Sequence, residues 1–418
     1  MKHKQIFNLL FAFSIAFPIG LQANDSNTIN SGTAHPSPAL VEFMQKVLDS
    51  HPEIQALQNT FLAAKAKRNA ADQPLYNPEM EFELERTDIN TFSVGVSQAL
   101  DWGNKRSASI DIADAEIHLV EAELMQLRFN LTEKIFNVLV DLQAAQKLQK
   151  LARKRVELMQ EFLSNTEKRQ QAGDVGIQDV ALAKVALSEA KMQLASSEAQ
   201  QAENLAELQA ASGIISNDWP LLVQEPPKSE QMQTLDSYLN QSPSLIALRT
   251  RLVMAKSNTR LAKAQRKADP TLGLRAGAED SEVLLGFTFS VPLNLRNTYS
   301  AEVEVANQET LQIEQLLLAE TQRARAHIQG AHHRYALIYA AWQSWKETGE
   351  TSLQQQMDLI QTIWKSGEMS TADYLVQAKQ NVDARETAVE LYSQMWQAWI
   401  EWLSVSTQIE NWIVEGNQ

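Results

Sequence analysis

Two parts of the chain alternate between apolar residues and polar or small ones, most strictly at residues 79–85. Residues 79–85 read Glu-Met-Glu-Phe-Glu-Leu-Glu, and the segment 91–100 follows with apolar side chains at alternate positions. Alternation with period two puts the apolar side chains on one face of a strand, whereas a helix would scatter them. The pattern returns in residues 272–276 and 283–291, where glycine, threonine and serine occupy many of the alternate positions. It predicts two hairpins, each with one apolar face and one small or polar face.

The segments that follow each hairpin have the composition and spacing of long helices. No proline occurs in residues 79–219 or 293–418. A coiled-coil period joins seven apolar residues: Leu124, Leu127, Leu131, Ile135, Val138, Leu142 and Ala145. We expect long helices at 104–172 and 294–366, return helices at 176–212 and 370–412, and helices before the hairpins at 39–72 and 235–268. The first long helix would extend about 100 Å at about 1.5 Å per residue, so an elongated molecule is expected.

The same order of elements occurs twice because the chain contains an internal repeat. Its landmarks are His51-Pro52 with Ser242-Pro243 (offset 191), Asn77-Pro78 with Asp269-Pro270 (192), residues 96–100 with 289–293 (193), and residues 172–179 with 366–373 (194). A nearly constant offset over four landmarks indicates two tandem copies of one unit. The expected organisation is a first repeat at 39–213, a linker at 214–234, a second repeat at 235–412 and a tail at 413–418.

The N-terminal residues have the layout of a secretory signal peptide. A basic start at Lys2 and Lys4 precedes an apolar run from Ile6 to Phe17, and Ala23 ends a passable cleavage site. The alternative is an apolar anchor, but the run is too short to span a bilayer as a helix. We therefore expect residues 1–23 to be removed on export.

Composition excludes several classes of function. The formal net charge is −14, which argues against binding to a nucleic-acid backbone, and the absence of cysteine excludes disulfides, zinc–thiolate sites and thiol catalysis. No nucleophile–base arrangement or phosphate-binding loop is present, so neither an enzyme nor a cofactor is expected. The spacing of His327, His332 and His333 does not favour a metal site.

The hairpins alone fit either a soluble sheet or a transmembrane β-barrel, and the export signal and repeat favour the barrel. Four strands cannot close a barrel, and unpaired edges are forbidden in lipid. Two copies would give eight strands with a filled interior, whereas three would give twelve strands and a channel. The predicted fold is mostly α: a long coiled-coil barrel of helices continued by a transmembrane β-barrel with four strands per chain, closed by trimerisation.

The doubled unit, its paired hairpins and a Gly-x-x-x-[Ile/Thr]-x-Asp turn in each repeat resemble the TolC-type outer-membrane factors, the outer membrane efflux proteins. The turns are Gly173-x-x-x-Ile177-x-Asp179 and Gly367-x-x-x-Thr371-x-Asp373. Three further motifs resemble the cobalt–zinc–cadmium resistance (CzcC-like) branch: His51-Pro52-Glu53, Asn77-Pro78-Glu79 and the segment Asp101 to Arg106. The resemblance covers about residues 39–412. It implies a homotrimeric conduit in the outer membrane that extends into the periplasm and meets a periplasmic adaptor and an inner-membrane RND-type pump.

The resemblance also implies roles for the two turns. The adaptor-docking tip would comprise Gly173, Val175, Ile177, Gly367 and Thr371, although plain helix-hairpin chemistry also explains these residues. The periplasmic gate would comprise Asp179, Trp364 and Asp373. A favourable interaction with the helix dipole is the simpler explanation for the two aspartates.

The polar face of the sheet would line the lumen of the barrel. Its charged residues would be Glu79, Glu81, Glu83, Glu85 and Arg275. Such a field favours cations, although simple solvation of a polar face explains the same pattern. Three functions therefore remain open: a conduit for metal cations, the same conduit for drugs or a secreted protein, and a soluble periplasmic coiled-coil scaffold.

Overall fold

The computed structural model describes residues 36–86, 90–216, 218–222, 225–228, 232, 234–280 and 282–415. The predicted signal peptide, residues 1–23, lies outside the described residues. Those that are described belong to one compact unit, Ala34–Gln418.

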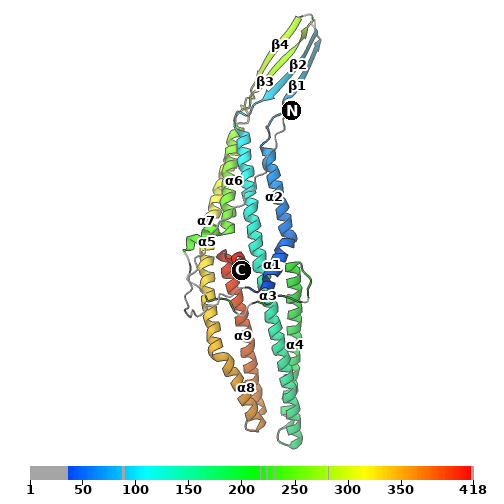
Figure 1. Ribbon diagram of the computed structural model, residues 1–418, viewed down its shortest axis with the longest axis vertical. Helices are drawn as coiled ribbons and strands as arrows, with labels where there is room; N and C mark the ends of the chain where they lie inside the picture. The colour runs from blue at the N-terminus through cyan, green and yellow to red at the C-terminus, as the bar shows by residue number, and fades with distance from the viewer. Residues whose placement is uncertain are drawn as a thin grey trace, which may run out of the picture. The chain divides into compact units, whose positions relative to one another are not determined.

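The described elements follow the predicted order of helices and strands in both repeats (Figure 1). The first repeat contains α1 (Pro38–Ser50), α2 (Pro52–Ala71), β1 (Glu79–Arg86), β2 (Asn90–Ala99), α3 (Lys105–Ala172) and α4 (Ile177–Ser212). The second contains α5 (Leu235–Gln241), α6 (Pro243–Gln265), β3 (Thr271–Glu279), β4 (Glu282–Ser290), α7 (Ser300–Ser344), the π-helix η1 (Trp345–Gly349), α8 (Glu350–Lys365), α9 (Thr371–Val405) and α10 (Ile409–Glu415).

The helices before the hairpins are broken, where the sequence pattern predicted continuous ones. His51 and Ser242 have extended ψ angles of 127° and 119°, and each is followed by the first residue of a new helix, Pro52 or Pro243. A proline ring clashes with a helical conformation of the residue before it, which explains both breaks. Because the apolar periodicity continues across each break, the sequence pattern did not reveal it.

The second long helix begins later than predicted and is interrupted. The predicted helix 294–366 begins at Ser300, because the Asn297 side chain accepts a hydrogen bond of 2.9 Å from the Tyr299 amide and holds a local turn. Its π-helical turn, Trp345–Gly349, was not predicted. The Trp345 ring packs over Gly349 so closely that a Cβ there would lie 2.3 Å from it.

The return helix of the second repeat ends earlier than predicted. The predicted helix 370–412 is divided into α9 and α10 by a turn at Ser406–Gln408, in which Thr407 has a φ of 61°. The turn folds α10 back so that the Trp412 ring lies 4.7 Å from Trp399 and 5.6 Å from Phe136.

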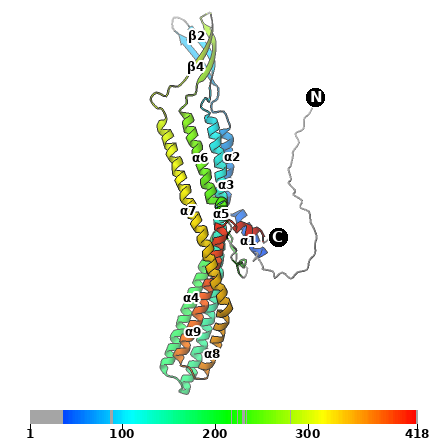
Figure 2. The same ribbon diagram turned by 90° about the vertical axis from the view of Figure 1, so that its left-hand side faces the viewer.

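The strands described form one antiparallel sheet in the order β1-β2-β3-β4. Glu81 lies opposite Gly95, Gly95 opposite Arg275, and Arg275 opposite Gly286. In both views the sheet lies beyond one end of α2, α3 and α6 (Figures 1 and 2). The two helical hairpins, α3–α4 and α8–α9, have their turns at the opposite end. Within the described chain, β1 and β4 are the two edges of this sheet.

The largest apolar core lies midway along α3, where the coiled-coil period was recognised. Ile135, Leu139 and Leu142 are fully or almost fully buried, and they belong to one cluster with Trp396 and Trp399 of α9. The tryptophans of α9 are therefore packing residues. In the part of the chain that the structure describes, no helix is both long enough and apolar enough to cross a membrane.

Candidate functional site

The polar face of the sheet brings together acids and hydroxyls from different strands. Ser97 Oγ donates a hydrogen bond of 2.7 Å to Glu81, and Ser93 Oγ donates one of 3.1 Å to Glu83. Arg275 Nη1 lies 2.6 Å from Glu83 Oε2, which joins β3 to β1 across β2. The Arg275 side chain lies flat over Gly286, where an added Cβ would be 2.7 Å from its Nε atom. Glu83 and Arg275 are thus a direct ion pair on one face.

The remaining predicted acids, Glu79 and Glu85, share this face by register. They form no side-chain hydrogen bond or ion pair with the described residues of β2–β4. Glu85 lies in a row with Thr91, Glu279 and Glu282, near the hairpin ends. Glu279 and Glu282 were not predicted from the sequence to belong to this face. Both could have been assigned to the polar face from the glycines, because residues an even number of positions apart on a strand share a face. Glu279 lies two residues after Gly277, and Glu282 lies four residues before Gly286.

The opposite face of the sheet is apolar and exposed. The exposed fractions reach 82% for Leu84 and 83% for Val283. The same face presents Met80, Phe82, Phe92, Val96, Leu272, Leu274, Leu285, Phe287 and Phe289. A contiguous apolar face of this kind marks a surface that is covered by lipid or by another protein.

A buried ion pair fixes the base of the sheet. Lys105, the first residue of α3, places its Nζ 2.6 Å from Asp269 Oδ2, just before β3. The two side chains are 17% and 8% exposed. The Tyr76 hydroxyl donates a hydrogen bond to the same carboxylate oxygen. Three segments that leave or enter the sheet therefore meet at one carboxylate.

This environment shifts the pKa values of Asp269 and Tyr76 in opposite directions. Burial pushes the pKa of Asp269 upward, but hydrogen bonds from Lys105 and Tyr76 outweigh it and leave that pKa below its ordinary value. The hydrogen bond to Asp269, with burial, raises the pKa of Tyr76 to about 12. Asp269 is therefore held ionised and Tyr76 protonated.

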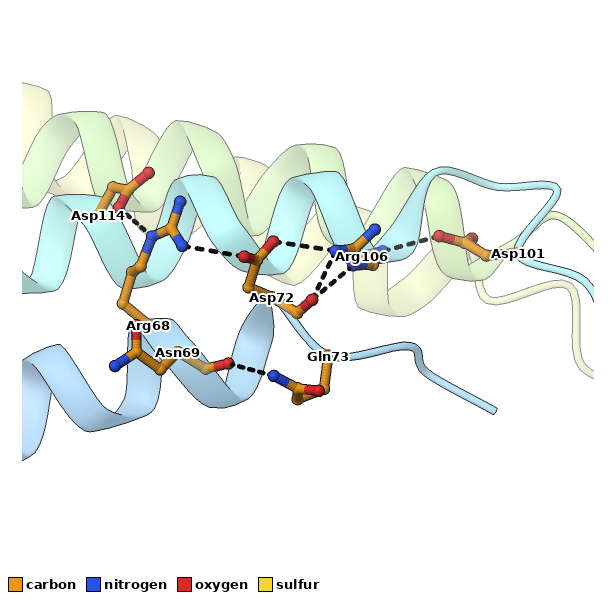
Figure 3. A network of polar contacts seen from close by, with 7 residues as sticks. All are labelled: Arg68, Asn69, Asp72, Gln73, Asp101, Arg106 and Asp114. Atoms are coloured by element: carbon orange, nitrogen blue, oxygen red, sulfur yellow. Dashed lines mark hydrogen bonds and ion pairs between the residues drawn. The ribbon is translucent and has the colours of Figure 1, made fainter. Parts of the chain in front are cut away.

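A second network joins α2 to the start of α3 (Figure 3). Arg106 contacts both the backbone carbonyl and the carboxylate of Asp72, with its Nη2 2.9 Å from Oδ1. Arg68 bridges Asp72 and Asp114 with distances of 3.2 Å to each carboxylate. Asp101 accepts hydrogen bonds from the backbone amides of Lys105 and Arg106 (2.8 and 2.9 Å), which caps α3.

Four residues of the segment Asp101 to Arg106, noted for its resemblance to the CzcC-like branch, have structural roles at this junction. Besides the cap and the two basic contacts, Gly103 passes close to α6, where a Cβ would lie 2.7 Å from the Ala264 carbonyl oxygen. Trp102 differs because its side chain is 67% exposed beside the sheet. Exposed tryptophans of this kind are common where a protein meets a membrane interface.

At the other end of α3, the two turns end their helices in the same way. Gly173 and Gly367 have φ angles of 86° and 83°, the left-handed conformation that favours glycine. The amides of Asp174 and Glu368 bond back to the Arg169 and Ile363 carbonyls, as in a Schellman motif.

The predicted docking residues differ in accessibility. Ile177 is 76% exposed and Val175 is half-buried, whereas Thr371 is only 3% exposed. Gly173 and Gly367 are exposed at the turns. Thr371 therefore adds no accessible surface to the tip.

The predicted gate aspartates act within the caps of their own helices. Asp179 accepts a hydrogen bond of 3.0 Å from the Gly176 amide. Asp373 accepts one of 2.6 Å from the Ser370 hydroxyl, which in turn accepts one from the Asp373 amide at 3.1 Å. Each carboxylate stabilises the first turn of a return helix. The gate role of these residues is not needed to explain their positions.

Trp364, the third predicted gate residue, is buried in an aromatic cluster. Its ring stacks on Tyr374 at 4.6 Å and packs on Phe162 at 5.1 Å, joining α8, α9 and α3. Burial raises the pKa of Tyr374 to about 12, with Glu161 adding to the effect. Among the described residues, Trp364 forms no hydrogen bond with Asp179 or Asp373.

Ion pairs that sequence analysis missed join the two helical hairpins. Lys379 of α9 lies 3.0 Å from Glu189 of α4, and Lys365 of α8 lies 3.2 Å from Glu161 of α3. Arg155 of α3 lies between the hairpins, 3.7 Å from Glu189 and 3.9 Å from Asp383. Glu189 and Asp383 are equivalent residues of the two repeats, at the offset of 194. This equivalence was the available sign in the sequence that both carboxylates occupy similar positions on their return helices.

In the described residues, no group of three or more histidine, cysteine, aspartate or glutamate side chains is arranged to hold a metal ion. The described part of the chain presents a two-faced sheet with open edges, a braced junction and a pair of turns.

The chain is similar to known proteins in sequence and in fold. Residues 43–214 match the outer membrane efflux protein family. The matched range runs from within α1 to just beyond α4, so the first repeat has the sequence pattern of an outer membrane efflux protein. No curated protein sequence matches the chain.

Solved structures extend the similarity in fold to nearly the whole chain. CusC is 14% identical, covering 90% of this chain and 93% of its own, with a TM-score of 0.76. The CmeC outer membrane channel of Campylobacter jejuni is 14% identical (97% and 98% covered, TM-score 0.73), and the outer membrane protein VceC of Vibrio cholerae is 16% identical (88% and 95%, TM-score 0.72). The fold of these solved structures therefore extends over both repeats of this chain.

Proposed function

We propose that this chain is one subunit of an outer-membrane export channel, in which three copies close a single β-barrel. The observation that supports the proposal most strongly is the sheet: one face is apolar and exposed, the other is charged, and both edge strands are open. Lipid satisfies the apolar face, and neighbouring copies satisfy the edges, which would otherwise leave backbone groups unpaired in the membrane. The charged face then lines water.

The helices continue the conduit into the periplasm and end at the two turns. An adaptor protein would dock on the exposed tip around Gly173, Val175, Ile177 and Gly367, and an inner-membrane RND-type pump would load the channel through that adaptor. Rigid helices that present short exposed loops suit such a role. The ion pairs of Arg155 and Lys379 would then set how firmly the two hairpins of each copy stay together at the entrance.

The proposed substrates are divalent heavy-metal cations. The acidic face of the sheet supports this choice, as does the resemblance of three sequence motifs to the CzcC-like branch. Three copies would place a ring of Glu81 and Glu83 side chains along the lumen, partly neutralised by Arg275. Such a ring concentrates cations relative to anions. Multidrug efflux or type I protein secretion through the same conduit is the alternative, because the pump has a large part in selecting the substrate.

Planar bilayer recordings test both parts of this proposal. The purified chain should form cation-preferring pores, and Glu81→Gln with Glu83→Gln should lower the preference. The change should be larger at low salt, because the Debye length shortens from about 30 Å at 0.01 M to about 10 Å at 0.1 M. Asp179→Ala with Asp373→Ala provides a background with weakened caps at the entrance, so that a closed entrance does not hide the effect.

Cell fractionation separates the channel from a periplasmic scaffold. Recovery of the mature chain in the soluble periplasm would refute the channel. A deletion strain with normal metal tolerance but impaired drug or protein export would refute the metal substrate and leave the conduit in place.

A further inference from the structure

The two open edges of the sheet belong to β1 and β4, and the internal repeat relates them to a junction that the structure already contains. In the repeat, β1 is equivalent to β3 at the offset of 192, and β2 is equivalent to β4 at the offset of 193. The β2–β3 junction therefore joins the second strand of one hairpin to the first strand of the next. A junction between β4 of one copy and β1 of another would join equivalent strands.

The hairpins show that the repeat preserves strand register. Glu79 lies opposite Ser97 in the first hairpin. Their equivalents at the two offsets are Thr271 and Ser290, which lie opposite each other in the second hairpin. The equivalence therefore transfers a register from one repeat to the other without slippage.

From the β2–β3 register, we infer that β4 of one copy pairs with β1 of a neighbouring copy so that Phe289 lies opposite the neighbour's Phe82 and Thr288 opposite its Glu83. These pairs correspond to Val96 with Leu274 and Gly95 with Arg275 inside the chain. The inference rests on the proposed function, because it requires copies of the chain to share one sheet.

The chemistry of both faces agrees with this register. Phe289 and Phe82 are exposed on the apolar face, at 55% and 68%, and the seam would pair them as aromatic neighbours. On the polar face, Thr288 and Ser290 would lie opposite the neighbour's Glu83 and Glu81. Within one chain, Ser93 and Ser97 donate hydrogen bonds to these same two glutamates from the β2 side. The seam would thus supply hydroxyls from the other side.

Barrel geometry provides an independent check. Directly paired residues form a row across the four strands, which starts at Glu79 and passes through Ser97, Gly273 and Thr288. Across the proposed seam it reaches the neighbour's Glu83, four residues along β1 from its start. With about 3.4 Å per residue and about 4.8 Å between strands, this shift over four strands tilts them by about 35°. Strands of barrels tilt by about 35–45°.

Slipped registers fit less well. A slip of two residues would place Phe289 opposite the neighbour's Met80 or Leu84, and the tilt would become about 20° or about 47°. A slip of one residue would place Phe289 opposite a glutamate and put lipid-facing and water-facing side chains on the same surface.

Disulfide cross-linking tests the register directly, since the natural chain contains no cysteine. Three double variants should be compared in outer membranes treated with a mild oxidant: Phe289→Cys combined with Phe82→Cys, with Met80→Cys or with Leu84→Cys. Opposed residues have Cα atoms about 4.5–5.5 Å apart, within disulfide range, whereas diagonal neighbours are about 7–8 Å apart. The Phe82→Cys pair should therefore give covalent dimers and trimers about tenfold more than either slipped pair. The single variants serve as controls and should remain monomeric on denaturing, non-reducing gels.

Dominant cross-linking through Met80→Cys or Leu84→Cys, or equal cross-linking in all three, would overturn the register. If the aromatic substitutions prevent assembly, Thr288→Cys with Glu83→Cys reads the same register from the polar face. A chain that conducts ions and stays in the membrane fraction, yet gives no cross-link with either matched pair, would overturn this inference alone. A chain that is soluble and does not conduct would instead overturn the proposed function.

Discussion

The ammonium group of Lys105 lies 2.6 Å from the carboxylate of Asp269, and the two residues come from different repeats of the chain. Lys105 begins the longest helix, and Asp269 precedes the first strand of the second hairpin. The contact therefore ties the direction of α3 to the position of the whole second hairpin. It connects the helical and the β parts of the molecule at a point shielded from water.

Removing the cation should destabilise the fold strongly. Lys105→Met leaves the nearly buried Asp269 without its charged partner, and we expect the free energy of unfolding to fall by about 3–5 kcal/mol. Urea unfolding in detergent measures the change. Lys67→Met is the matched control, because Lys67 is 63% exposed in its pair with Glu116, and it should change stability by at most about 1 kcal/mol. Equal effects of the two substitutions would contradict the structural role of Lys105.

The contribution of Asp269 should disappear in acid. Its folded-state pKa lies below the unfolded value, so the folded state favours the ionised carboxylate. The resulting stability is complete above the unfolded pKa of about 4 and is lost as the pH falls through the lowered, folded-state pKa. The difference in unfolding free energy between the wild type and Asp269→Asn should shrink over that range. A difference that is constant from neutral pH to below pH 3 would show that the charge of Asp269 is not responsible.

The two faces of β4 should respond oppositely to a charge. Phe287→Lys places an ammonium group on the apolar face and should destabilise the assembled protein by about 2–4 kcal/mol if the residue lies near the middle of the bilayer. Thr288→Lys, one residue along, faces the polar side and should be tolerated. Refolding into lipid vesicles measures both. Equal tolerance would mean that the assignment of the faces is wrong.

The tip glycines should separate docking from folding. Gly173→Val forces a β-branched residue into a φ of 86°, which should cost about 1–2 kcal/mol locally although nothing lies near the added Cβ. Gly330→Val adds the same atoms to a helical position with equal space and should be harmless. Export should fall in the first variant only, while the yield of trimer stays normal in both. Loss of trimer after Gly173→Val would support a purely structural role for the turn.

The sequence predicts those features that depend on local pattern. The limits of α3 differ from the expected helix by a single residue. The alternation in β1 assigns each side chain to its observed face, and that in β4 does so except at Leu284, which lies on the polar face opposite Gly277. The breaks at His51 and Ser242 could have been recognised from the prolines that follow them, but the apolar periodicity on both sides concealed them. The break at Thr407 has no such signal, because a threonine with positive φ is rare.

The contacts that brace the candidate surfaces were beyond local pattern. Lys105 and Asp269 are 164 residues apart, and Lys379 and Glu189 are 190 apart, so only the folded chain brings them together. The capping role of Asp373 is different: Ser370 stands three residues before it, which is a recognisable capping signature. The burial of Trp364 depends on Phe162 and Tyr374 from two other helices, and no spacing in the sequence indicates it.

The π-helical turn at Trp345–Gly349 explains an irregularity in the repeat. The offset between equivalent residues is 193 at residue 293 but 194 at residue 367, so the second copy has one extra residue between these points. A π turn closes with an i→i+5 bond and takes up one residue more than an α turn. The bulge is therefore long enough to take up the extra residue within a single turn. Helical positions beyond it, such as Tyr374 and Asp383, then keep the angular phase of their counterparts in the first copy.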